Sequence, residues 1–182
     1  EVAARCVDVV MPVADITTFV VTGARDRFAP PCVVPCAPAA IVERAADKIA
    51  LVDTARRLGV PVPDSIVATR PEPLPEIPWE GPVVIKPQRS RVRTPGGWKS
   101  TAVSYAADRA ALVRDLNGRA AHDFPVMLQK QVVGPGMGVF ACYHAGRPVA
   151  SFSHRRLRER PPWGGVSVLC ESAAVDPIAG AY

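Results

Sequence analysis

Apolar residues form short β-branched runs and stripes at helical spacing along the chain, a pattern that predicts a mixed α and β protein. The run at 7–13 predicts a buried strand. A helix follows, with Asp15 or Thr17 as its cap and Gly23 near its end. Four prolines in the twelve residues 29–40 predict a connector with at most one short edge strand.

Residues 41–58 carry the strongest helical pattern of the sequence. We expect two helices that meet near Asp47, because an aspartate can cap the second one. Gly59 ends that helix as a C-terminal cap does. The chain then predicts a strand at 65–69 and a proline-rich surface connection at 71–82.

Strands dominate the remainder, which makes the predicted fold class α+β. One more helix, capped by an aspartate, is expected at 108–116, and a polar loop with two glycines at 90–100. A hairpin is expected to turn at Ala145 and Gly146. The other predicted strands lie at 83–87, 101–106, 124–133 and 164–175.

Composition places the chain among soluble globular proteins, since 48% of its 182 residues are apolar and 21% are charged. Collagen, coiled coil and disordered tail are thereby excluded. No apolar run approaches the roughly 20 residues that cross a bilayer, and the N-terminus has no initiator Met and no signal-peptide pattern. We expect a cytoplasmic protein that does not span a membrane, and an internal start.

Five cysteines are an odd number, and the pair Cys32 and Cys36 has no second pair or histidine nearby to complete a zinc site. Reduced thiols in the cytosol are the better interpretation. The net charge is +5, and arginine supplies 18 of the 22 positive charges. Because the sequence uses so few lysines, each lysine is a candidate for a site that needs a compact, flexible ammonium. The four lysines are Lys48, Lys86, Lys99 and Lys130.

Lys86 ends a predicted strand and precedes a loop with Gly96 and Gly97. Ligand groups often lie at strand ends, and glycines let backbone N–H groups approach a phosphate. Several segments follow one another in a recognisable order. They are a capped helix with Lys48, the strand VVIKP with Lys86, a loop and helix, the segment LQKQVVGPGMGV at 128–139 and a long hairpin. This order resembles the ATP-grasp superfamily over essentially the whole chain, most closely proteins similar to a carbamoyl-phosphate synthetase large-chain module.

The resemblance implies a nucleotide cleft between two α+β lobes. Residues 1–46 would be the end of a pre-ATP-grasp domain and a connector. Residues 47–131 would form the small lobe, and 132–182 the start of a truncated large lobe.

The same resemblance assigns roles to single residues. Lys48 and Lys86 would bind the ATP phosphates, where a mobile ammonium can follow charge that shifts during transfer. Gln129, Lys130 and Val132 match the strand that meets adenine.

Residues 89–99 would be the flap over the phosphates. Many ATP-grasp enzymes carry several glycines in a row there, whereas this chain has QRSRVRTPGGWKS, so Arg and Lys side chains would do some of the holding that backbone amides do elsewhere. Which of Arg89, Arg91 and Arg93 points inward stays open. The alternative is a solvated, mobile loop.

Clustered arginines at 153–165 could suit a nucleic acid, but the segment lacks interleaved surface aromatics and a recognition-helix pattern. We therefore expect no nucleic-acid partner. The resemblance places His154 against ATP and Arg156 and Arg158 as catalytic groups near an acyl phosphate. The alternative for these arginines is an ordinary surface ion pair with Glu159.

The implied reaction is that of an ATP-dependent ligase with ATP and Mg²⁺, which activates a small carboxylate as an acyl phosphate for attack by an amine or similar nucleophile. The family's metal ligands are a Glu and a Glu-x-Asn pair, which we expect beyond residue 182, so we expect an inactive internal segment of a longer protein. The alternative is a nucleotide-binding module without turnover. Exposed apolar strands at 137–175 predict self-association or a poorly ordered end.

Overall fold

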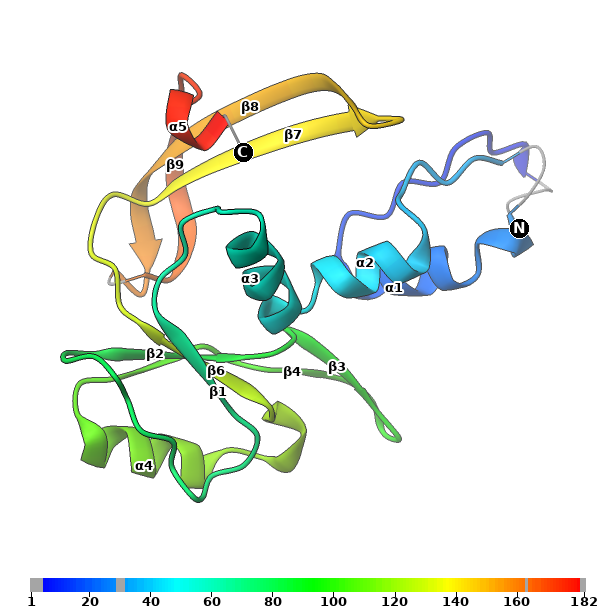
Figure 1. Ribbon diagram of the computed structural model, residues 1–182. Helices are drawn as coiled ribbons and strands as arrows, with labels where there is room; N and C mark the ends of the chain where they lie inside the picture. The colour runs from blue at the N-terminus through cyan, green and yellow to red at the C-terminus, as the bar shows by residue number, and fades with distance from the viewer. Residues whose placement is uncertain (1–4, 29–31, 163, 181–182) are drawn as a thin grey trace. The chain divides into compact units, whose positions relative to one another are not determined.

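The computed structural model describes residues 5–28, 32–162 and 164–180, and the chain divides into two compact units, Glu1–Gln131 and Val132–Tyr182 (Figure 1). Within the described residues, every helix is too short or too polar to cross a bilayer. The helices of the first unit are α1 (Asp15–Gly23), η2 (Arg25–Arg27), α2 (Ala39–Ala45), α3 (Lys48–Arg57), α4 (Arg109–Gly118) and η3 (Ala121–Asp123).

A four-stranded antiparallel sheet in the order β1-β6-β2-β5 forms the core of the first unit. Its central strands β6 and β2 are the most apolar, and their residues Ile85 and Leu128 are fully buried. Helix α4 lies along one face and buries Leu112 and Leu116 in the same core (Figure 1). The strands are β1 (Ser65–Ala68), β2 (Val83–Pro87), β5 (Ser104–Ala106) and β6 (Val126–Lys130).

The segment expected as a polar loop at 90–100 is instead a β-hairpin of β3 (Arg91–Thr94) and β4 (Gly97–Ser100). Arg91 pairs with Ser100 and Arg93 with Trp98. Gly97 takes a φ of +104°, a value that favours glycine. The prediction missed the strands because polar residues occupy most of their positions.

The segment 7–13 is not the buried strand that its β-branched residues predict. Among the described residues its ladder contact is a single parallel bridge between Val9 and Val33, and Val13 is 92% exposed. This bridge fits the single short strand allowed for the connector 29–40, of which 29–31 lie outside the described residues.

Helix α1 begins where it was predicted, but neither Asp15 nor Thr17 is its cap residue. Ala14 holds that position, and the Thr17 hydroxyl donates to the Ala14 carbonyl at 2.8 Å.

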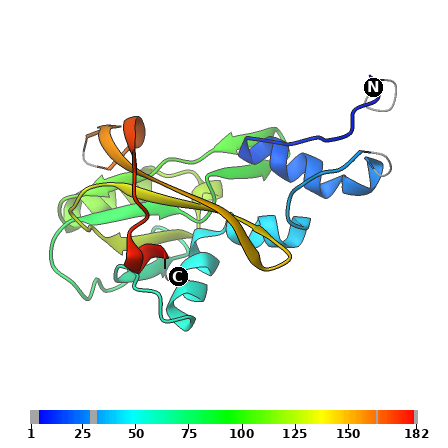
Figure 2. The same cartoon turned by 90° about the horizontal axis from the view of Figure 1, so that it is seen from above.

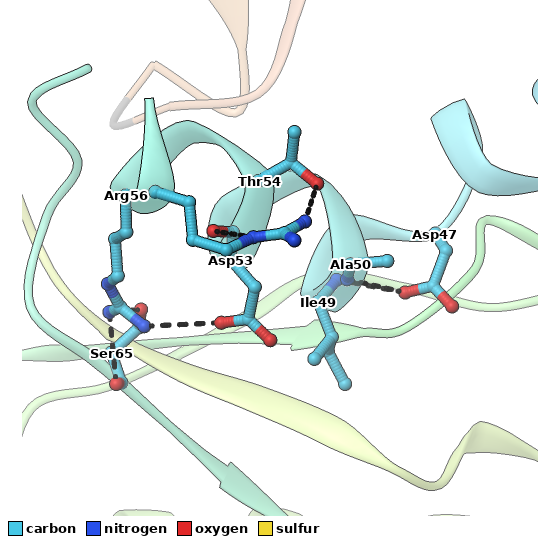
Figure 3. A network of polar contacts seen from close by, with 8 residues as sticks. Asp47, Ile49, Ala50, Asp53, Thr54, Arg56 and Ser65 are labelled. Carbon is cyan, nitrogen blue, oxygen red and sulfur yellow. Dashed lines mark hydrogen bonds and ion pairs between the residues drawn. The ribbon is translucent and has the colours of Figure 1, made fainter. Parts of the chain in front are cut away.

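Asp47 caps α3 as predicted and also ties that helix to the sheet. Its Oδ1 accepts hydrogen bonds from the backbone N–H groups of Ile49 and Ala50, each at 3.0 Å (Figure 3). Its Oδ2 accepts from Gln88 Nε2 at 2.6 Å, and the Lys48 N–H donates to the Gln88 carbonyl at 2.9 Å. The start of α3 is therefore fastened to the end of β2.

The second unit is a three-stranded antiparallel sheet followed by the short helix α5 (Pro177–Gly180). The predicted turn is confirmed, since Ala145 and Gly146 have φ values of 50° and 76°. Apolar residues such as Phe140 and Phe152 are about half exposed, as predicted for these strands. The strands are β7 (Met137–His144), β8 (Arg147–Arg160) and β9 (Val166–Ala173).

The double role of Asp47 predicts a large stability effect. We expect Asp47→Ala to lower the free energy of unfolding by about 2 to 4 kcal/mol, because a cap and a charge-assisted hydrogen bond are lost together. Asp47→Asn keeps the capping oxygen and should lose about half as much. Urea denaturation measures both values.

The matched control is Asp53→Ala on the same helix. The Asp53 carboxylate is 61% exposed and lies 3.6 Å from Arg56, so its loss should change stability by about 0.5 kcal/mol or less. Equal effects of Asp47→Ala and Asp53→Ala would show that Asp47 does not fasten the helix.

Candidate functional site

Two lysines lie on the two elements that Asp47 joins, helix α3 and strand β2. Lys48 is the first residue of α3, and Lys86 is near the end of β2. Lys86 Nζ donates to Gln129 Oε1 on the neighbouring strand β6 at 2.7 Å, and Lys48 Nζ donates to Ser90 Oγ at 2.9 Å. Neutral oxygens thus orient both ammonium groups, and no carboxylate of a described residue forms an ion pair with either.

Burial lowers the pKa of both lysines, because it disfavours a charged ammonium. The positive charge of Lys86 lowers the pKa of Lys48 further, while Asp15 and Asp47 oppose this effect. The backbone of Lys48 is bonded to Gln88, two residues after Lys86, so the two lysines lie near each other, and Lys48 senses the charge of Lys86. An anion placed between them would relieve both the desolvation and the repulsion.

The residues expected to meet adenine differ in which of their hydrogen-bonding groups are free to bind a ligand. Gln129 is buried, and its side-chain oxygen is engaged by Lys86. The Lys130 N–H donates to the Asp64 carbonyl at 2.8 Å, and the Lys130 side chain is exposed. No hydrogen bond within the described part of the chain engages the Val132 N–H, and Val132 is 71% exposed. Of the three backbone donors, that of Val132 is the one left for a ligand.

The hairpin β3–β4 occupies the place of the expected flap. Arg91, Arg93 and Trp98 share one of its faces, since Arg91 and Arg93 are two residues apart and Arg93 pairs with Trp98. Trp98 stacks on Phe19 of α1 with ring centroids 5.6 Å apart and planes 11° apart. The arginine-bearing face is therefore turned toward α1.

Each flap arginine has a different environment. Arg89 forms an ion pair with Glu43 of α2 at 2.7 Å, and Arg91 donates to Ser100 Oγ. Arg93 is exposed. A hollow of about 190 Å³ lies beside Lys48 and is lined by Asp15, Phe19, Ala45, Ala46, Lys48, Arg89, Ser90 and Arg91.

Sequence reasoning missed Gln88, Ser90 and the Phe19–Trp98 stack. Gln88 and Ser90 come just after β2, the strand that carries Lys86. Polar residues at that place in the sequence could have indicated that they orient the lysines. Nothing local in the sequence indicates that Phe19 meets Trp98.

The other predicted site residues belong to the second unit, on strand β8. His154 packs on Phe140 with ring centroids 5.2 Å apart, and its Nε2 is buried without a partner among the described residues. Arg156 forms an ion pair with Glu159 at 3.1 Å, the contact weighed above against a site role. Arg158 is exposed.

Two lysine ammonium groups suit a triphosphate, but no matching Mg²⁺ site is visible. Within residues 5–28, 32–162 and 164–180, no group of three or more His, Cys, Asp or Glu side chains could hold a metal ion. Cys32 is buried and Cys36 half-buried, and both are free thiols.

Comparison with known proteins finds structural relatives only. No family model and no curated protein matches the sequence. L-amino acid ligase from Bacillus licheniformis aligns with a TM-score of 0.65 and 13% identity, over 95% of this chain and 38% of that one. D-alanine–D-alanine ligase from Bacillus anthracis aligns at 0.63 and 17%, over 96% and 56%. A structure of that ligase complexed with ATP aligns at 0.60 and 16%, over 95% and 55%.

The chain therefore spans 38 to 56% of the length of the ligase chains in these three structures. Its mixed α and β fold with antiparallel sheets is shared with these ligases. The finer likeness to a carbamoyl-phosphate synthetase module stays an interpretation.

The repulsion between the lysines can be measured directly. We expect Lys86→Met to raise the pKa of Lys48 toward its ordinary value, because the substitution removes a like charge and leaves a side chain of similar length. NMR titration of the lysine side chains measures this shift. Lys99→Met, in the hairpin, should leave the pKa of Lys48 unchanged, and equal pKa values in wild type and Lys86→Met would contradict the arrangement.

Proposed function

We propose that this chain is the nucleotide-binding part of an ATP-dependent ligase of the carboxylate–amine type. The observation that carries the proposal is the pair of neighbouring, half-buried lysines Lys48 and Lys86, whose ammonium groups form no ion pair with a carboxylate of a described residue. The shared fold with ligases, one of them complexed with ATP, supports it. In this proposal residues 47–131 are the small lobe, 132–182 the start of the large lobe, and 1–46 precede both.

Each step of the reaction asks something of the phosphate-binding residues. A carboxylate oxygen of the substrate attacks the γ-phosphorus, the bond from that phosphorus to the β,γ-bridging oxygen breaks, and ADP leaves with the electron pair. An amine then attacks the acyl carbon and expels inorganic phosphate. Negative charge moves onto the leaving oxygen in the first step, and the flexible ammoniums of Lys48 and Lys86 can follow it. Mg²⁺ would neutralise the phosphate oxygens during transfer.

The remaining predicted residues take supporting roles in the proposal. Gln129 holds the Lys86 ammonium in place through its 2.7 Å hydrogen bond. The Val132 N–H reads an adenine edge acceptor, beside Lys130. On β8, His154 contacts the nucleotide, and Arg156 and Arg158 stabilise the acyl phosphate.

A nucleotide-binding module without turnover is the second candidate. It is favoured by the flap, which has arginines and only two glycines in place of a longer glycine run, and by the ion pair that already engages Arg156. Such a protein would bind ATP with the same two lysines and release no ADP.

Loss of one ammonium tests the proposal. Lys86→Ala should weaken ATP binding about tenfold to a hundredfold, the range expected when a hydrogen bond to a charged group is lost. Titration calorimetry with ATP and Mg²⁺ measures the affinity, and ADP release by the full-length protein with panels of carboxylic acids and amines measures turnover. Arg114→Ala, which removes an exposed cation on α4, is the matched control.

The outcomes separate the two candidates. Acid-dependent ADP release supports the ligase, whereas ATP binding that is sensitive to Lys86→Ala but gives no ADP supports the module without turnover. An affinity that Lys86→Ala does not change would overturn both.

A further inference from the structure

A second hollow, of about 490 Å³, lies within the first unit between α1, α2 and the hairpin β3–β4. Its volume falls in the range of roughly 300 to 1,000 Å³ that is usual for small-molecule sites. Figure 2 shows the hairpin alongside α1. The hollow shares Phe19, Arg89 and Arg91 with the smaller hollow beside Lys48, so the two adjoin.

One part of the lining is an apolar wall. Phe19 and Val20 come from α1, and Val92 and Trp98 from the hairpin. The stack of Trp98 on Phe19 holds the hairpin and the helix at a fixed spacing. A flat or branched apolar group fits against such a wall.

The charged part of the lining is strongly unbalanced. Three arginines and one glutamate line the hollow, and the glutamate, Glu43, is engaged by Arg89. Arg91 donates to the neutral Ser100 hydroxyl, and no hydrogen bond or ion pair joins Arg93 to a described residue. Two guanidinium groups therefore face the hollow without a carboxylate, in the fork geometry that binds carboxylates bidentately.

We propose that this hollow binds the acid that the ligase activates, and that it selects an acid with an apolar, preferably aromatic, body and a second carboxylate. This assignment rests on the proposed function. The carboxylate to be activated lies at the end that adjoins Lys48, where the ATP phosphates are proposed to bind. The apolar body lies on the wall of Phe19 and Trp98. The second carboxylate is bound by Arg93, and Arg91, which lines both hollows, lies between the two carboxylates.

Three acids dissect the hollow by titration calorimetry on the full chain. Phenylsuccinate carries both proposed features, 3-phenylpropionate lacks the second carboxylate, and succinate lacks the ring. We expect phenylsuccinate to bind about tenfold or more tightly than either of the others, because each lacks one set of contacts.

Variants locate the contacts. Arg93→Gln should weaken phenylsuccinate about tenfold to a hundredfold and 3-phenylpropionate less than twofold. Trp98→Ala should weaken both aromatic acids, and Trp98→Phe, which keeps a stacked ring if the alanine variant misfolds, should restore most of the affinity. Arg147→Gln in the second unit is the matched control for lost charge.

Two results would overturn the inference: phenylsuccinate binding no better than succinate, or Arg93→Gln behaving as Arg147→Gln. Inorganic phosphate competing with phenylsuccinate at equal concentration would show a simple anion site and also overturn the acid class. The failures are distinguishable, because these titrations contain no nucleotide. If ATP binds, Lys86→Ala abolishes that binding and no acid binds, the proposed ligase stands and the proposed acid class is wrong. If an acid binds and ATP does not, the proposed ligase is wrong.

Discussion

The carboxylate of Asp47 is the interaction on which the arrangement of the first unit depends. One oxygen caps α3, and the other accepts from Gln88, directly after β2. A helix start carries unpaired N–H groups that attract negative charge, so Asp47 satisfies a requirement of the helix and a requirement of the sheet together. Its consequence is that Lys48 and Lys86, 38 positions apart in the sequence, are held near each other although their charges repel.

Holding like charges together costs free energy, and the core of the unit supplies the rigidity that maintains the arrangement. Ile85 and Leu128 are fully buried on the two central strands, one residue before Lys86 and one before Gln129. The lysine that is hydrogen-bonded to Gln129 therefore emerges from the best-packed part of the sheet. Sites that are tuned for an anion are often strained in this way before the anion binds.

The sequence could predict whatever depends on neighbours along the chain. The Asp47 cap, the turn at Ala145 and Gly146 and the apolar strands β2 and β6 were all expected, because each has a local signal. The hairpin β3–β4 and the exposure of 7–13 were not expected, because each depends on whether a segment pairs with another strand. At the site, Lys48 and Lys86 came from a family resemblance, whereas the contact of Phe19 with Trp98 joins residues 79 positions apart and leaves no local trace.

Lysine and arginine differ in chemistry, and the first unit uses them at different places. The sequence uses arginine for 18 of its 22 cations, yet lysines occupy the two half-buried positions beside the proposed phosphates. A phosphoryl group that moves during reaction suits a flexible ammonium, whereas a carboxylate that stays bound suits a rigid guanidinium fork. Lysine at 48 and 86 and arginine at 91 and 93 therefore match a moving anion at one end and a fixed anion at the other. This assignment of lysines to the moving anion and arginines to the fixed anion follows from the chemistry of the side chains, whichever acid the protein uses.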